Sequence, residues 1–152
     1  MRRIYLDNNA TTPVLPEVLE AMRPYFGEHF GNASSIHHHG QETRAAIEQA
    51  RDSVASLLGC RSREIVFTSG GTESDNLAIA GLASAGDHII TSSIEHHAVL
   101  QACKHAEEIG CQVTCVPVDG RGLVNPDDVR RALRPNTKLI SIMMANNETG
   151  AL

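Results

Sequence analysis

The chain has 152 residues, a length typical of one domain, and a domain of this size buries roughly two thirds of its unfolded surface. Its apolar content of 41% and charged content of 20% are those of an ordinary globular protein. The formal net charge of −5 and the lack of a basic stripe argue against nucleic acid as a general partner. No apolar run has the length of a signal-peptide core or a membrane span, so we expect a cytoplasmic protein without a membrane partner.

The amino-terminal part predicts a short strand followed by two helices. Ile4–Leu6 has the composition of a strand, and Pro16 then marks a helix start. Apolar residues continue at helical spacing as far as Phe26. A longer helix is expected at 40–58, ended by Gly59, with one buried face. That face comprises Ala46, Ala50, Val54, Leu57 and Leu58.

From residue 64 onward, strand patterns and helix patterns alternate. The expected strands are 64–68, 88–91, 113–118 and 138–144, and the expected helices between them are 72–84, 97–109 and 127–133. Alternation of this kind is typical of βαβ units, so we predict an α/β fold with a mostly parallel sheet and helices on both faces. We divide the chain into an amino-terminal segment, residues 1–15, and one domain that begins at residue 16 and continues to 152. Because the sheet pattern stops without a closing helix, we expect this domain to be incomplete at its carboxyl end.

A glycine-rich turn joins the expected strand 64–68 to the helix that follows it. Gly70 and Gly71 permit a sharp turn and the close approach of a ligand. Thr72 and Asp75 fit the S/T-x-x-D/E pattern of a helix start. Free N–H groups and the positive end of the helix dipole attract an anion at such a position. The turn matches neither the dinucleotide nor the Mg-ATP glycine pattern, and an ordinary capped connection is an equally good interpretation of the turn alone.

Polar side chains follow two further strands. His96 and His97 come after the strand at 88–91, and Asn146 and Asn147 come after the last strand. In a parallel sheet these loops and the glycine turn meet at the carboxyl edge, where open α/β sheets bind ligands. Each has a simpler explanation, since a histidine can begin a helix and asparagines favour turns. Their placement at one edge favours a site.

The spacing of the cysteines and histidines does not indicate a metal site. The four cysteines show no C-x-x-C pattern. Cys111 and Cys115 flank a strand-like segment, where a metal pair is an alternative to two small buried apolar side chains, the interpretation we favour. Consecutive imidazoles at His37–His39 point in different directions on a regular backbone. We therefore assign no metal.

Several longer motifs occur in order along the whole chain. They are Tyr5–Pro13, Phe30–Asn32 with Ser34, Ser35 and His37, Thr68–Asn76, Glu95–His96, and Ala145–Gly150. Together they resemble the N-terminal part of cysteine desulfurases of the NifS/IscS type. Those enzymes belong to the class V aminotransferase group, which has the type I fold of pyridoxal-phosphate enzymes. The resemblance implies that residues 16–152 are the N-terminal part of a large domain that binds this cofactor.

The resemblance also implies roles for individual residues. Gly71 and Thr72 match positions that hold the phosphate of pyridoxal 5′-phosphate through a backbone N–H and a hydroxyl. His96 matches the histidine that stacks on the pyridine ring and moves protons, and Asn147 matches the amide that contacts the phenolic oxygen of the ring. The implied reaction converts L-cysteine to L-alanine and passes the sulfur on as an enzyme persulfide for iron–sulfur cluster assembly. The implied partners are a second copy of the chain and a sulfur-acceptor or scaffold protein.

Three residues that the family requires have no counterpart in this sequence. These are the lysine that forms a Schiff base with the cofactor, the aspartate at the pyridine nitrogen and the cysteine that takes up the sulfur. Lys104 and Lys138 do not match the family's lysine, and none of the four cysteines matches its nucleophile. We therefore expect this chain alone to be inactive and to need a complementing carboxyl-terminal part. Another class V enzyme, or a non-catalytic interaction module that keeps the phosphate pocket, remains an alternative.

Overall fold

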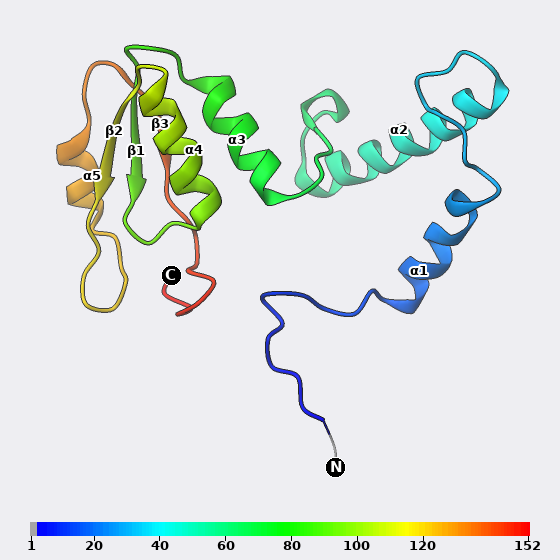
Figure 1. Ribbon diagram of the computed structural model, residues 1–152, viewed down its shortest axis with the longest axis horizontal. Coiled ribbons are helices and arrows are strands. Elements are labelled where there is room, and N and C mark those ends of the chain that lie inside the picture. Colours follow the sequence, from blue (N-terminus) through cyan, green and yellow to red (C-terminus); the bar gives the residue numbers. More distant parts are fainter. Residues whose placement is uncertain (1–2) are drawn as a thin grey trace. The chain divides into compact units, whose positions relative to one another are not determined.

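A computed structural model describes residues 3–152 of the chain (Figure 1). The structure divides into two compact units, one up to Phe67 and one from Thr68 to Leu152. The predicted boundary after residue 15 stays a prediction. Each unit is described by itself below.

The first unit is helical. Helix α1 (Pro16–Met22) continues into a short 3-10 helix (Arg23–Phe26), and the long helix α2 (His38–Leu58) follows after a loop. Pro24 explains the change of helix type, because it has no N–H to donate within an α-helix. Its carbonyl instead accepts from the N–H groups of the three residues that follow Phe26. The predicted helices are confirmed, and the αL conformation of Gly59, with φ 68°, ends α2 as expected.

Two predicted strands are wrong. Ile4–Leu6 forms no strand, and its apolar side chains are exposed. In the segment 64–68, a 3-10 turn (Ser62–Glu64) is followed by extended backbone that belongs to no strand. Strand-forming residues alone do not make a strand, since its N–H and C=O groups need a neighbouring strand to pair with. Within residues 3–152, neither segment has such a neighbour.

The predicted buried face of α2 is also wrong in part. Leu57 and Leu58 are 85% and 66% exposed, whereas Thr43 and Ala55 are buried. Helical spacing marks a stripe of apolar residues, but which part of the stripe is covered depends on what packs against it. Near its carboxyl end, α2 is covered on the Ala55 side rather than on the leucine side.

The second unit contains a parallel sheet of three strands, β1 (His88–Ser92), β2 (Gln112–Val116) and β3 (Thr137–Ser141). Their order is β2-β1-β3, and β1 pairs in parallel with both neighbours. Every residue of β1 is buried, as expected for a central strand covered on both faces. The α/β prediction is thereby confirmed, with β3 ending three residues earlier than the expected strand.

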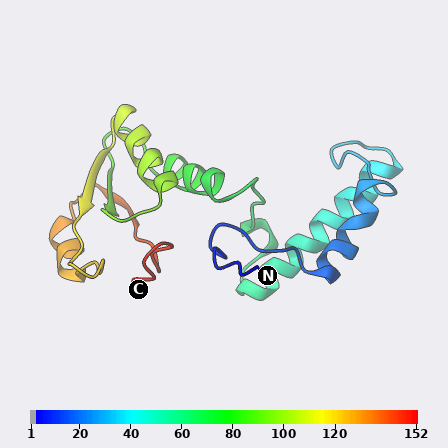
Figure 2. The same cartoon turned by 60° about the horizontal axis from the view of Figure 1, so that its bottom comes forward.

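Helices α4 (His97–Glu108) and α5 (Pro126–Ala132) cover opposite faces of this sheet (Figure 1). The strand order explains why the two helices cover opposite faces of the sheet. The connection from β1 to β2 runs in one direction across the sheet and that from β2 to β3 runs back. Crossovers between parallel strands are right-handed almost without exception, and two right-handed crossovers that run in opposite directions place their helices on opposite sides. Helix α3 (Gly71–Leu82) packs beside α4, as Figures 1 and 2 show.

The core of the second unit lies between α3, α4 and the sheet. It comprises Ile79, Ala83, Ile89, Val99, Ala102, Cys103, Ala106 and Cys111. The expectation that Cys111 is a small buried side chain is confirmed, but Cys115 is exposed. Cys115 lies on β2, which is an edge strand, so one of its faces is less completely covered. Burial raises the pKa of the Cys103 and Cys111 thiols, which keeps both protonated at neutral pH.

Two observations concern metals and membranes. Within residues 3–152, no group of three histidine, cysteine, aspartate or glutamate side chains is placed to hold a metal ion. No helix in that range combines the length and the apolar character needed to cross a bilayer.

His88 links all three strands at the amino edge of the sheet. Its Nδ1 lies 2.8 Å from the hydroxyl of Thr137 on β3, and its Nε2 lies 2.8 Å from the hydroxyl of Thr114 on β2. The side chain is fully buried. Burial lowers the pKa of His88 below 6.5, and the positive charge of Arg134 lowers it further. The folded state therefore favours the neutral form of the His88 imidazole.

This burial predicts a pH-dependent stability. Unfolded His88 takes up a proton near pH 6.5, while the folded form resists protonation. Its contribution to the free energy of unfolding is thus fully present above that pH. It is lost as the pH falls from there through the lower pKa of the folded state. Denaturant unfolding of wild type and His88→Gln between about pH 5 and about pH 8 checks this, because only wild type should show this loss. An equal pH dependence of the free energy of unfolding in both proteins would contradict this role of His88.

Candidate functional site

The loop after β1 carries the first candidate residue. The chain leaves β1 at Ser92, and His96 then caps helix α4, because its Nδ1 accepts a hydrogen bond from the N–H of Ala98 at 3.1 Å. The simpler interpretation, that this histidine begins a helix, is therefore correct. It does not exclude a functional role, since the His96 ring is exposed and the cap fixes its position.

The loop after β3 is organised around Asn146. Its Oδ1 accepts hydrogen bonds from the N–H of Glu148 at 3.0 Å and from the N–H of Thr149 at 2.9 Å. Gly150 completes the turn with φ 74°, a conformation that favours glycine. Asn146 therefore shapes a turn, as asparagines often do, and this turn presents Asn147 on an exposed position.

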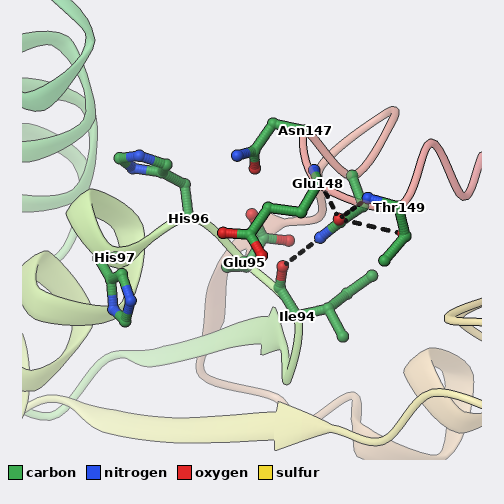
Figure 3. Close-up of a pocket in the computed structure, with 8 residues that line it drawn as sticks. Ile94, Glu95, His96, His97, Asn147, Glu148 and Thr149 are labelled. Atoms are coloured by element: carbon green, nitrogen blue, oxygen red, sulfur yellow. Dashed lines mark hydrogen bonds between the residues drawn. The ribbon is translucent and has the colours of Figure 1, made fainter. Parts of the chain in front are cut away.

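The two loops enclose one pocket of about 330 Å³ (Figure 3). Its lining consists of Ile94, Glu95, His96, His97, Asn146, Asn147, Glu148 and Thr149. Figure 3 shows the amide of Asn147 directed toward the side on which the His96 ring lies. The predicted meeting of His96 and Asn147 is thus observed, even though they are far apart in the sequence. An imidazole and an amide in one polar pocket can bind and orient a small polar ligand.

Helix α3 begins at the glycine turn. Gly70 is its N-cap residue, and no side chain caps the helix there. The S/T-x-x-D/E pattern had placed Thr72 at the cap, but Thr72 lies inside the first turn. Ser69 instead donates from its N–H and its hydroxyl to the carboxylate of Glu73, both at 2.6 Å. Both bonds lower the pKa of Glu73 below 4.5, and the bond from the Ser69 hydroxyl has the larger effect.

The amino end of α3 is open to a ligand. A Cβ placed on Gly70 or Gly71 would meet no atom within 4 Å. In Figure 1, α3 and α4 both begin on the side toward which β1 points. Gly71 and Thr72 do not contribute to the lining of the pocket between the two loops. A joint site for all four predicted residues therefore stays a prediction.

Sequence analysis named Glu95 and Asn146 within its motifs but did not predict that their side chains join the two loops. Glu95 is only 8% exposed, and its carboxylate accepts from the N–H of Met143 at 2.7 Å. Asn146 donates from Nδ2 to the carbonyl of Ile94 at 3.0 Å. The signal for Glu95 was a charged residue soon after a buried strand, and the signal for Asn146 was the asparagine pair itself.

Comparison with known proteins places the chain in a family. The family described as Aminotransferase class-V matches residues 4–152. The chain belongs to this family. The resemblance drawn from the motifs is confirmed, because curated relatives of high identity over 99% of the chain are named cysteine desulfurases.

Two curated relatives illustrate the similarity. The chain is 57% identical to a protein named cysteine desulfurase IscS from Dictyoglomus turgidum, over 99% of the chain and 39% of that protein. It is 56% identical to the cysteine desulfurase IscS of Methanosarcina thermophila, over 99% of the chain and 38% of that protein. The chain thus spans about two fifths of the length of the relatives it matches.

Solved structures agree with this assignment. A NifS-like protein superposes with a TM-score of 0.90 and 42% identity, over 97% of this chain and 42% of that one. A structure described as SspA in complex with cysteine gives a TM-score of 0.87 at 45% identity, over 95% of this chain and 43% of that one. The predicted type I fold, present in part, is confirmed by these neighbours.

The cap at α4 predicts the tautomer of His96. Because Nδ1 accepts the hydrogen bond from Ala98, the neutral ring must carry its proton on Nε2. Long-range ¹H–¹⁵N NMR of the histidine side chains, with His96→Gln to assign the signal, should identify the Nε2–H tautomer. A neutral His96 protonated on Nδ1 would contradict the capping geometry.

Proposed function

We propose that the chain provides the phosphate-binding and ring-binding part of a cysteine desulfurase that uses pyridoxal phosphate. The observation that carries the proposal is the pocket between the loops after β1 and β3, which contains His96 and Asn147. The class-V family and its desulfurase relatives support the cofactor and the substrate, L-cysteine. The structure described as SspA in complex with cysteine matches 95% of this chain and 43% of its own chain.

The residues at the start of α3 fit a phosphate group. The cap position is a glycine, no side chain occupies the cap, and the first-turn N–H groups have no helical acceptor. A phosphate dianion bound there would accept these N–H groups and lie at the positive end of the helix dipole. Gly71 would contribute its N–H, and Thr72 its N–H and hydroxyl.

His96 and Asn147 fit the ring of the cofactor. The exposed imidazole of His96 offers a flat face for stacking, and its Nε2 holds a proton that can be donated into the pocket. The amide of Asn147 would donate to the phenolic oxygen. When bound, pyridoxal phosphate supplies an electron sink for the reacting amino acid. The protein's contribution is to hold the ring and to place the His96 proton beside it.

The remaining parts of the reaction are assigned to the full-length protein. We propose that it works in the cytoplasm as a homodimer, forms L-alanine and passes sulfur through a persulfide to an acceptor or scaffold protein. The lysine, the aspartate and the cysteine of the family would lie outside these 152 residues. Sulfide release from L-cysteine by the purified full-length protein, with an added thiol that reduces the persulfide, tests the activity, and no release with saturating cofactor and thiol would contradict it.

Thr72→Ala should weaken binding of pyridoxal phosphate to the full-length protein. Loss of a hydroxyl that donates to a charged group corresponds to about 1–3 kcal/mol of binding free energy. The dissociation constant can be measured by titrating the apoprotein and following the absorbance of the cofactor. Ser84→Ala, which removes an exposed hydroxyl beyond the other end of α3, is the matched control and should bind like wild type. Equal affinities of the Thr72 variant and wild type would remove Thr72 from the phosphate site.

His96→Gln should reduce turnover more than cofactor retention. Proton transfer by a positioned side chain contributes roughly 10²-fold to 10⁴-fold to a rate. Stacking is only part of what holds the cofactor. Sulfide release and bound cofactor are measured on the same preparation. His105→Ala, at the other end of α4, is the control. A turnover number for His96→Gln close to that of wild type would exclude proton transfer by His96.

A further inference from the structure

The two loops that form the pocket are joined by a reciprocal pair of hydrogen bonds. Glu95 extends from the first loop and accepts from the N–H of Met143 in the second, at 2.7 Å. Asn146 extends from the second loop and donates to the carbonyl of Ile94 in the first, at 3.0 Å. In Figure 3, the dashed line at the carbonyl of Ile94 marks this second bond. We call this pair the loop clamp.

The two members of the loop clamp directly precede the two candidate site residues. Glu95 is followed by His96, and Asn146 is followed by Asn147. A shift of either clamp residue therefore moves its neighbour in the pocket. The first member is also fixed from its own side, because the same oxygen of Glu95 accepts from the hydroxyl of Ser92 at 2.8 Å.

The chemistry of Glu95 argues for more than packing. Burying a carboxylate is unfavourable unless hydrogen bonds compensate for the lost water, and an apolar residue would fill the same space more favourably. A charged acceptor in turn makes shorter and stronger hydrogen bonds than a neutral one. A buried carboxylate that accepts a backbone N–H of the opposite loop thus fixes the distance between the loops.

We propose that Glu95 and Asn146 are positioning residues that set the separation of the His96 ring and the Asn147 amide. This role rests on the proposed function of the pocket, but the loop clamp itself is testable without the cofactor. Neither residue touches the reacting atoms in this proposal. Each acts through the neighbour that follows it in the sequence.

Conservative and non-conservative variants distinguish loss of the loop clamp from a general loss of stability. Glu95→Ala removes the acceptor, whereas Glu95→Gln keeps an oxygen that can accept from Ser92 and Met143. Asn146→Asp keeps the Oδ1 acceptor of the turn but loses the donor to Ile94. Asn136→Ala is the matched control, because its side chain donates to the carbonyl of Gly86 at 2.8 Å, which is also a bond between loops but at the opposite sheet edge.

Hydrogen exchange of the full-length protein, without added cofactor, reads out the clamp. In Glu95→Ala, the Met143 amide should exchange roughly 10-fold to 100-fold faster than in wild type. The amides of the segment 94–97 should also exchange faster. Glu95→Gln should exchange much more slowly than Glu95→Ala. Asn146→Asp should loosen the same two loops while the amides of Glu148 and Thr149 stay protected. Asn136→Ala should leave both loops unchanged. Uniformly faster exchange in every variant, or no change at Met143, would overturn the clamp.

Steady-state kinetics then test the positioning role. In the full-length enzyme, Glu95→Ala and Asn146→Asp should lower kcat for sulfide release at least about tenfold with a smaller change in KM, because the chemical step needs the ring and amide in register. Glu95→Gln should restore most of kcat. A clamp seen by exchange, combined with wild-type kcat in Glu95→Ala, would overturn the positioning role and leave the proposed function standing. A wild-type protein that binds no pyridoxal phosphate would overturn the proposed function and, with it, this role.

Discussion

The parallel pairing of β1 with both of its neighbours is the constraint on which the site depends. Ile89 and Ile90 at its centre are fully buried, so β1 can only lie between two strands and beneath helices on both faces. Parallel pairing of β1 with β3 also forces the loops that follow them to leave the sheet at the same edge. His96 and Asn147 meet because of this pairing, although they lie in separate βα units.

The two edges of the sheet are fixed by different chemistry. At the amino edge, the neutral ring of His88 bridges the hydroxyls of Thr114 and Thr137, which suits a region that only has to be stable. At the carboxyl edge, a buried carboxylate and an amide join the loops directly. Burying the carboxylate has a free-energy cost that its hydrogen bonds must offset, but a charged acceptor makes stronger hydrogen bonds than a neutral one. Proteins commonly accept such local disadvantages at functional sites.

The strands β1, β2 and β3 were predictable from the sequence, because Gly86, Gly110 and Pro135 separate them from the preceding helical patterns. The segment 64–68 was not, since a strand depends on a neighbour that the segment's own residues do not reveal. His96 and Asn147 could be placed at one edge from the alternation alone. The loop clamp could not, because its bonds join residues 48 and 52 positions apart and depend on β1 and β3 being neighbours in the sheet.

The central claim is that the first turn of α3, the ring of His96 and the amide of Asn147 serve one cofactor. A crystal structure of the full-length protein grown with pyridoxal phosphate tests it most directly. The account predicts the phosphate on the N–H groups of Gly71 and Thr72, with the pyridine ring against His96. A cofactor bound elsewhere, with these residues facing solvent, would contradict the account.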